Sequence, residues 1–295
     1  MEGENKILVV GGAVGTFLAT KLHADGQRVD LFGRSKVTAL PDQLRIQEKL
    51  YESPSRLLEL PRDASYEYVI LATKLHHLRE VLELLQTVRL RAEKVFSVQN
   101  GLVDNAQFAQ IFGNHIPHIA SVFDGFRLDG DRLLTTNTGR GWKVEDTSEG
   151  RDFAAMLSRA SILCAAEPNL DRVRAEKSLA NCCLNGLSAI LNKTFAELFS
   201  DPETLRRIER LFDECYAILS TEFRLESADV LKEHMVKDWR YAEHYSSTWQ
   251  DYTAGKPTEI EYLNGYMVKL GQEKRLPVWE NLRIVEALDH SGGSQ

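Results

Sequence analysis

The chain has 295 residues, 43% of them hydrophobic and 27% charged, and its formal net charge is −7. This balance is typical of a globular protein rather than a disordered one, and the acidic charge disfavours nucleic acid as the main partner. The length suggests two domains, and no stretch reaches the roughly 20 apolar residues of a membrane helix.

The four cysteines show neither the paired spacing of a metal site nor a disulfide framework. We therefore predict reduced core thiols and no bound metal. The first residues lack the basic start and apolar run of a signal peptide, so we expect a cytoplasmic protein. Residues 291–295 are predicted to form a disordered tail.

A strand, a glycine turn and a helix open the chain. The apolar run Lys6–Val10 precedes a helical pattern from Phe17 onward, and a second strand is predicted at Arg28–Phe32. This βαβ pattern is typical of a dinucleotide-binding motif, in which glycines let the backbone approach the pyrophosphate and the helix N-terminus supplies amide donors. The predicted cofactor-binding residues of the turn are Gly11, Gly12, Ala13, Val14 and Gly15.

The turn departs from the usual G-x-G-x-x-G pattern. If Gly12 and Gly15 are the second and third glycines, the first falls on Val10, and the loop reads as one residue short. A strand-to-helix turn that binds no nucleotide is the alternative interpretation.

The end of the second strand indicates which dinucleotide would bind. An NAD site places a carboxylate there for the ribose 2′-hydroxyl, whereas the 2′-phosphate of NADP attracts a cation. The chain offers Arg34, with Lys36 nearby, while Asp30 lies within the strand and is expected to point away from the ribose. The pattern therefore favours NADP.

Two further strands are predicted at Tyr68–Ala72 and Lys94–Val98, with a helix from about His76 to Val88 between them. Ligands bind at the carboxyl ends of strands in open parallel sheets. Lys74 and Asn100 follow these strands and are therefore candidates for contact with a cofactor or substrate. A solvated lysine and a common Asn-Gly turn are the alternatives.

The other segments of the first half are less regular. Residues 41–60 are predicted to be helical, and from about Ile116 short strands with Asp-Gly turns suggest an antiparallel extension of the sheet. A helix is predicted over about 150–163, and 167–169 is expected to be the interdomain linker.

Every long segment after the linker has a helical pattern. Helices are predicted to start at Ser200–Glu203 and at Ser227, and Thr258–Glu261 has the spacing of a capping box. The predicted domains are residues 1–168 and 169–290.

One helix of this second half, Lys177–Asn192, is apolar apart from a polar seam. Its polar residues recur at steps of three and four and so share one face: Lys177, Asn181, Asn185, Ser188 and Asn192. A buried polar group without a partner costs roughly 1–3 kcal/mol. We therefore predict a polar cleft along the seam, with a water-facing helix as the alternative.

With these motifs, the chain resembles the ketopantoate reductase (2-dehydropantoate 2-reductase) family. The match is carried in order by the glycine turn with Arg34, Thr73-Lys74, Gln99-Asn100-Gly101, Lys177 with Asn181, and the segments 246–251 and 258–266. The resemblance spans about residues 6–288. It implies an α/β fold, with a Rossmann-like dinucleotide-binding domain, an all-α C-terminal domain and an active site between them.

The resemblance also implies roles for individual residues. Lys177 is expected to be the general acid/base, assisted by Glu259, and the cofactor is expected to be NADPH. The predicted substrate-binding residues are Asn181, Ser247, Asn100, His244 and Glu259, while Arg34, Lys74 and Asn100 are predicted to contact the cofactor.

The chemistry of hydride addition fits these roles. Reduction of a ketone builds negative charge on oxygen, which the Lys177 ammonium can stabilise before it donates a proton. The Glu259 carboxylate can accept a hydrogen bond from a substrate hydroxyl and balance the charge of Lys177. The alternatives are a helix-capping role for Glu259 and a helix-end role for Ser247.

Several positions depart from the family. His244 stands where the family usually has asparagine, residues 122–124 replace a Thr-Thr-His-like stretch, and 192–195 lack the usual Pro-Asn pattern. These departures leave a small 2-oxo acid other than ketopantoate open as the substrate.

The predicted function is NADPH-dependent reduction of a small 2-oxo acid, with ketopantoate as the leading substrate. The alternatives are a different 2-oxo acid and a nucleotide-binding sensor or interaction protein without turnover. We expect a small-molecule substrate and neither nucleic acid nor membrane as a partner. A homodimer through the helical domain is compatible with the sequence.

Overall fold

The computed structural model describes residues 6–33, 41–102, 117–136 and 139–289. The chain divides into two compact units. Unit 1 comprises residues 1–100 and 104–170, and unit 2 comprises residues 101–103 and 171–295. Within the described ranges, no helix is long and apolar enough to cross a membrane.

Unit 1 is built on an eight-stranded sheet with the strand order β12-β11-β8-β7-β6-β1-β2-β5. Its strands are β1 (Lys6–Gly11), β2 (Arg28–Phe32), β5 (Ser55–Leu57), β6 (Ser65–Ala72), β7 (Arg91–Ser97), β8 (His118–Val122), β11 (Trp142–Glu145) and β12 (Cys164–Glu167). From β5 to β8 all neighbouring strands are parallel, so their carboxyl ends lie at one edge.

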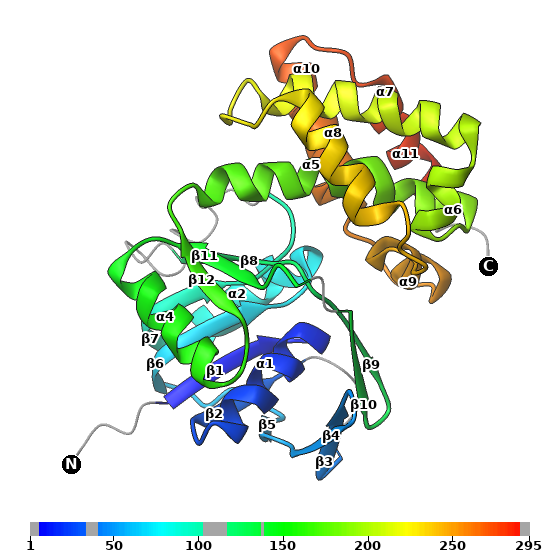
Figure 1. Ribbon diagram of the computed structural model, residues 1–295. Coiled ribbons are helices and arrows are strands. Elements are labelled where there is room, and N and C mark those ends of the chain that lie inside the picture. Colours follow the sequence, from blue (N-terminus) through cyan, green and yellow to red (C-terminus); the bar gives the residue numbers. More distant parts are fainter. Residues whose placement is uncertain (1–5, 34–40, 103–116, 137–138, 290–295) are drawn as a thin grey trace. The chain divides into compact units, whose positions relative to one another are not determined.

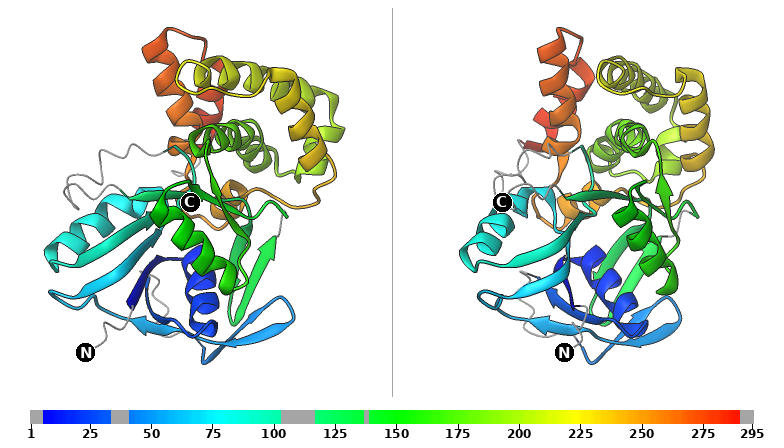
Figure 2. Two further views of the ribbon diagram at one scale, coloured as in Figure 1. Left: turned by 60° about the vertical axis from the view of Figure 1, so that its left-hand side comes forward. Right: turned by 90° about the vertical axis from the view of Figure 1, so that its left-hand side faces the viewer.

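Helices cover both faces of this sheet. α1 (Ala13–Ala24) and α4 (Ser148–Arg159) lie on one face (Figure 1), and α2 (Leu78–Thr87) lies on the other (Figure 2). The core beneath α1 and α4 takes alternate strand residues such as Val9 and Ile70, as expected for strands that are buried on both faces. Phe96 of β7 stacks on Phe153 of α4 with ring centroids 4.0 Å apart.

The prediction of helix over residues 41–60 is wrong. This segment forms β3 (Gln43–Ile46), β4 (Lys49–Glu52) and β5. Leu44 and Ile46 alternate inward on β3, and Gln47 turns the chain toward β4 with a φ of 54°. The strand pattern is stabilised by pairing with a distant segment, β10, which sequence periodicity alone does not reveal.

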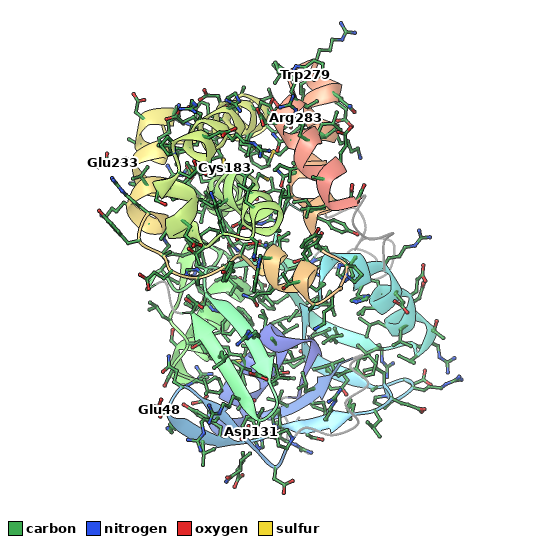
Figure 3. The ribbon with its side chains drawn as sticks, turned by 90° about the vertical axis from the view of Figure 1, so that its right-hand side faces the viewer. Glu48, Asp131, Cys183, Glu233, Trp279 and Arg283 are labelled. Carbon is green, nitrogen blue, oxygen red and sulfur yellow. The ribbon has the colours of Figure 1, made fainter. Side chains whose placement is uncertain are left out.

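The hairpin predicted around Arg127–Leu134 is present, but it does not extend the large sheet. β9 (Gly125–Asp129) and β10 (Arg132–Thr136) pair antiparallel and join a separate sheet with the order β4-β3-β10-β9. Glu48 lies in the turn after β3 and Asp131 in the turn before β10 (Figure 3); because β3 and β10 are parallel, these turns are at opposite ends of their strands. The large sheet is instead extended by β8, β11 and β12, and β12 occupies part of the predicted linker.

Unit 2 consists of helices around α5 (Leu170–Leu191). The others are α6 (Phe195–Ser200), α7 (Pro202–Leu219), α8 (Ala228–Trp239), α9 (Ser247–Thr253), α10 (Asn264–Lys274) and α11 (Trp279–Asp289). Cys183 of α5 lies in the interior among these helices (Figure 3). Gly186 permits close packing, because a Cβ there would collide with the Ile284 side chain of α11.

Two of the three predicted helix starts in unit 2 are confirmed. Asp201 caps α7 and Ser227 caps α8, each with its side chain accepting a backbone N–H. The capping box predicted at Thr258–Glu261 is wrong, because a 3₁₀ turn, η2 (Ile260–Tyr262), follows and α10 starts only at Asn264. An α/β unit followed by a helical unit confirms the predicted fold class.

Candidate functional site

The glycine turn lies at the carboxyl edge of the large sheet. β1 ends at Gly11, Gly12 is the N-cap of α1, and the helix begins at Ala13. A Cβ on Gly11 would collide with the Ala72 carbonyl oxygen, and one on Gly15 would lie 3.3 Å from the Val9 side chain. Gly11 is therefore required by the packing of β1 against β6, and Gly15 keeps α1 close to β1.

Gly12 is different from its neighbours. It is exposed, and a Cβ built on it would meet no protein atom within 4 Å. Side-chain packing therefore does not require glycine here, whereas a pyrophosphate approaching the backbone at the N-terminus of α1 would. The residues of the turn thus fit a dinucleotide.

The ends of the neighbouring strands lie beside this turn. Gly11 is in register with Ala72 of β6, and a Cβ on Gly33, after β2, would lie 2.9 Å from the Gly11 carbonyl oxygen. Arg34, the predicted 2′-phosphate contact, lies outside the described residues. Lys74 is half-buried and is the N-cap residue of η1 (Leu75–His77).

Asp30 is held inside the sheet. Its carboxylate lies 2.8 Å from the Lys6 ammonium and accepts a hydrogen bond of 3.0 Å from the Tyr66 hydroxyl. Burial and the neighbouring carboxylate raise the pKa of the Tyr66 hydroxyl above its ordinary value. Asp30 therefore lies within β2, in register with Leu8, and not at the carboxyl end of the strand, where an NAD site places its ribose-binding carboxylate.

Gln99, which belongs to the Gln99-Asn100-Gly101 motif but was not predicted as a site residue, joins two strand ends at this edge. It is 7% exposed, and its amide donates to both the carbonyl oxygen and the hydroxyl of Thr73 at 3.0 Å. The adjacent Asn100, a predicted site residue, is half-buried. The sequence signal for Gln99 is an amide side chain directly after an apolar strand and next to the candidate Asn100, since a buried amide needs hydrogen-bond partners.

In unit 2, the polar seam of α5 has two halves. The C-terminal half binds the start of α9: the Ser246 hydroxyl donates to the Asn185 carbonyl, and the Ser246 amide donates to the Ser188 hydroxyl at 3.2 Å. The Trp249 indole donates to the Asn192 side chain at 2.7 Å. This half of the seam therefore holds α9 on α5.

The N-terminal half of the seam contains Lys177 and Asn181, which are both half-buried. They lie one helical turn apart on one face of α5. The C-terminal half thus accounts for part of the buried polarity that the sequence assigned to a cleft, and Lys177 and Asn181 remain the candidates for chemistry.

The geometry at the starts of α9 and η2 bears on the alternative roles of Ser247 and Glu259. Ser246, not Ser247, caps α9 by accepting the Trp249 amide at 3.0 Å, and Ser247 is exposed in the first turn. Glu259 is 8% exposed and precedes η2 without capping it by its side chain. Glu259 therefore lacks the helix-capping role that was its alternative, whereas Ser247 stands at the start of α9, as its helix-end alternative requires.

His244 lies in an aromatic cluster. Its ring centroid is 5.2 Å from that of Phe195 and 6.0 Å from that of Trp239. Burial lowers the pKa of His244 below its ordinary value, which favours a neutral imidazole.

The predicted site residues within the described ranges are divided between the two units. Unit 1 brings the glycine turn and Lys74 together at the carboxyl edge of the sheet, with Asn100 on a neighbouring strand end. Unit 2 contains the remaining ones: Lys177 and Asn181 on α5, His244 and Ser247 around the start of α9, and Glu259 before η2. Across the described part of the chain, no three His, Cys, Asp or Glu side chains form a cluster that could hold a metal ion.

A parallel sheet with an open glycine at its carboxyl edge, followed in sequence by a helical unit, defines a two-domain dinucleotide-binding protein. The family models agree with this class. The model described as ketopantoate reductase PanE/ApbA matches residues 7–145, and the model of the C-terminal domain of the same family matches residues 169–291. The chain belongs to the ketopantoate reductase family, and is therefore an oxidoreductase that uses a nicotinamide dinucleotide.

Individual relatives are distant in sequence. The 2-dehydropantoate 2-reductase of Aquifex aeolicus (strain VF5) is 24% identical over 288 residues, which cover 91% of each chain. The enzyme of the same name from Shigella flexneri is 32% identical over 167 residues, covering 54% of this chain and 53% of that relative.

Solved structures share the fold along nearly the whole chain. A PanE/ApbA family ketopantoate reductase from Ralstonia eutropha JMP134 has a TM-score of 0.86 at 22% identity and covers 98% of both chains. D-mandelate dehydrogenase with NADH and anilino(oxo)acetate has a TM-score of 0.85 at 19% identity, covering 97% of this chain and 98% of that chain.

Proposed function

We propose that this protein reduces a small 2-oxo acid to the 2-hydroxy acid with NADPH, and that ketopantoate is its leading substrate. The observation that carries the proposal is Gly12, a glycine that the fold leaves open at the N-terminus of α1. The family membership supplies the class of reaction. The curated relatives named 2-dehydropantoate 2-reductase favour ketopantoate, at identities that also leave room for another 2-oxo acid.

The cofactor would lie along the carboxyl edge of the large sheet. The turn Gly11–Gly15 would hold the pyrophosphate, with Lys74 on the adenosine side and Asn100 near the nicotinamide. Arg34 would contact the 2′-phosphate, and the preference for NADPH over NADH is supported by Asp30, which is bound to Lys6 and Tyr66. When bound, NADPH supplies the hydride for the substrate carbonyl carbon.

The helical unit would supply the proton. We propose that the Lys177 ammonium stabilises the charge that develops on the substrate oxygen and then donates its proton there. The carboxylate of Glu259 would accept a hydrogen bond from a substrate hydroxyl and balance the charge of Lys177. The proposed substrate contacts are Asn181, Ser247, Asn100 and His244.

Domain limits, location and assembly are proposals of the same kind. We propose that residues 1–168 form the cofactor domain, that residues 169–290 form the substrate domain, and that the enzyme works in the cytoplasm. A homodimer is supported by a related structure, a ketopantoate reductase from Staphylococcus aureus that is described as dimeric.

A thermal-shift titration with NADPH and NADH tests the cofactor part. A ligand that binds only the native state raises the melting temperature by mass action. We expect a saturable rise that needs less NADPH than NADH. No rise with either nucleotide at millimolar concentration would refute the proposal.

Turnover is tested by following NADPH oxidation with ketopantoate, pyruvate and phenylglyoxylate. We expect oxidation that depends on a 2-oxo acid and is fastest with ketopantoate. NADPH binding without oxidation by any member of the panel would instead identify a nucleotide-binding protein without turnover.

A further inference from the structure

Unit 1 contains a cavity at the amino-terminal end of the large sheet, away from the glycine turn. Its volume is about 240 Å³, and it lies between α4 and the strands β1 and β6. Of its lining residues, Ile7 is at the start of β1, Gln27 directly precedes β2, and Glu67 is in the first half of β6. Because these strands are parallel, the cavity is at the end of the sheet opposite to Gly11. It is therefore distinct from the proposed cofactor site.

Part of the lining is apolar. Ile7, Tyr68 and Met156 are buried members of the core cluster, and Ala155 contributes a short, exposed side chain beside them. The volume is below the roughly 300–1,000 Å³ of pockets that hold drug-sized ligands. The cavity therefore suits a small molecule with a short apolar part.

Two side chains of opposite charge come to this cavity from α4, which lies over the sheet (Figure 1). Asp152, Met156 and Arg159 follow one another at steps of four and three, so they share one face of the helix. The rise of an α-helix separates the backbones of Asp152 and Arg159 by about 10 Å. The lining thus has a carboxylate toward one end of α4 and a guanidinium toward the other, with Met156 between them.

The carboxylate side of the cavity keeps a net negative charge. Glu67 is half-buried, and its charge and that of Asp152 act on the same ammonium, Lys94. Lys94 donates a hydrogen bond of 3.2 Å to the Tyr68 hydroxyl and lies 4.0 Å from the Asp152 carboxylate. Two carboxylates therefore share one cation, and a second cation is favoured beside them.

The guanidinium side is open to a ligand. Arg159 is exposed, and within the described part of the chain its guanidinium forms neither an ion pair nor a hydrogen bond. An exposed arginine alone is ordinary. Here, however, it lines a cavity whose other charged lining residues, Glu67 and Asp152, are both acidic.

We propose that this cavity binds a small zwitterion whose ammonium and carboxylate are separated by a short methylene chain, an ω-amino acid. The ammonium lies beside Glu67 and Asp152, the methylene groups lie on Ile7 and Met156, and the carboxylate binds Arg159. A guanidinium can bind a carboxylate with two parallel hydrogen bonds, which gives the ligand one orientation. This binding site is independent of the proposed reaction.

Thermal-shift titration of the full chain with 6-aminohexanoate tests the proposal. We expect a saturable rise in melting temperature. Glycine, whose charges are too close together, and hexanoate and hexylamine, which each lack one charge, should bind at least about tenfold more weakly. Glycine also controls for the general effect of a zwitterion on stability.

Arg159→Gln and Glu67→Gln should each weaken the binding of 6-aminohexanoate by at least about tenfold. The matched control is Arg151→Gln, an exposed arginine of the same helix that pairs with Asp146 and should bind like the wild type. The affinity should be the same with and without saturating NADPH.

Three results would overturn the proposal. The first is a rise with glycine equal to that with 6-aminohexanoate, and the second is an Arg159→Gln variant that binds like the wild type. The third is loss of binding when NADPH is added, which would place the zwitterion in the cofactor site.

Discussion

The glycine turn of unit 1 and the polar seam of unit 2 differ in how their residues contribute to the fold: the turn does so by close packing, and the seam by hydrogen bonds. In the turn, Gly11 and Gly15 are explained by close packing, and Gly12 alone is open. In the seam, Ser188 and Asn192 hold the start of α9, while Lys177 and Asn181 lie on the preceding turns of the same helix face. In both regions a functional motif therefore also contains residues that serve the structure.

Among substitutions in the two regions, the largest effect on activity is expected at Lys177. Lys177→Ala should lower kcat by about 10² to 10⁴-fold, because a positioned general acid contributes that much. NADPH binding, measured by thermal shift, should persist. The control is Lys237→Ala, an exposed lysine of α8, which should leave kcat unchanged. Undiminished kcat in Lys177→Ala would contradict the catalytic role.

The two adjacent glycines should respond in opposite ways. Gly11→Ala should lower the free energy of unfolding by about 1–3 kcal/mol, because the new Cβ collides with the Ala72 backbone. Gly12→Ala, whose new Cβ meets no protein atom, should lower stability less than Gly11→Ala does, and should weaken NADPH binding. Urea denaturation and NADPH titration of both variants measure these effects. If Gly11→Ala lost as much NADPH affinity as Gly12→Ala and kept the stability of the wild type, the distinction between a structural Gly11 and a cofactor-facing Gly12 would be wrong.

Substitutions at the contact between the C-terminal half of the seam and α9 should lower the free energy of unfolding. Ser246→Ala removes an N-cap and a bond to the Asn185 carbonyl, and should cost about 1–2 kcal/mol in urea denaturation. Ser247→Ala, the exposed neighbour, should leave the free energy of unfolding within about 0.5 kcal/mol of the wild type and raise KM for the 2-oxo acid. The reverse pattern would exchange the roles of the two serines.

The smallest effect is expected at His244. Burial lowers its pKa, so the unfolded chain binds more protons than the native one below the ordinary histidine value of about 6.5. Its contribution to stability is therefore present above that pH and is lost as the pH falls. His244→Gln should flatten the dependence of melting temperature on pH between about 5 and 7, and an unchanged slope would refute this account.

Local patterns predicted the elements that position the site in unit 1. The β1–α1–β2 unit follows from short-range apolar spacing and glycines, and the helix containing Lys177 follows from its periodicity. The segment 43–57 was assigned wrongly because its strands are stabilised partly by pairing with β10, which follows much later in the chain. Sequence periodicity carries no signal of such a partner.

The candidate site shows the same limit. The polar face of α5 was visible in the sequence, but its division into two halves was not, because Ser246 and Trp249 come from a distant helix. The role of Gln99 likewise depends on Thr73, across two neighbouring strands. Residue types thus indicated where polar groups gather. The hydrogen-bond partners of these groups could be identified only from the structure.

The most direct test of the account follows the hydride itself. NADPH carrying deuterium at the transferable position is incubated with ketopantoate or phenylglyoxylate, and the product is analysed by mass spectrometry. We expect a 2-hydroxy acid with one deuterium on C2 from the wild type, and at most trace amounts from Lys177→Ala. Unlabelled product, or no product although NADPH binds, would contradict the assignment as an NADPH-dependent 2-oxo acid reductase.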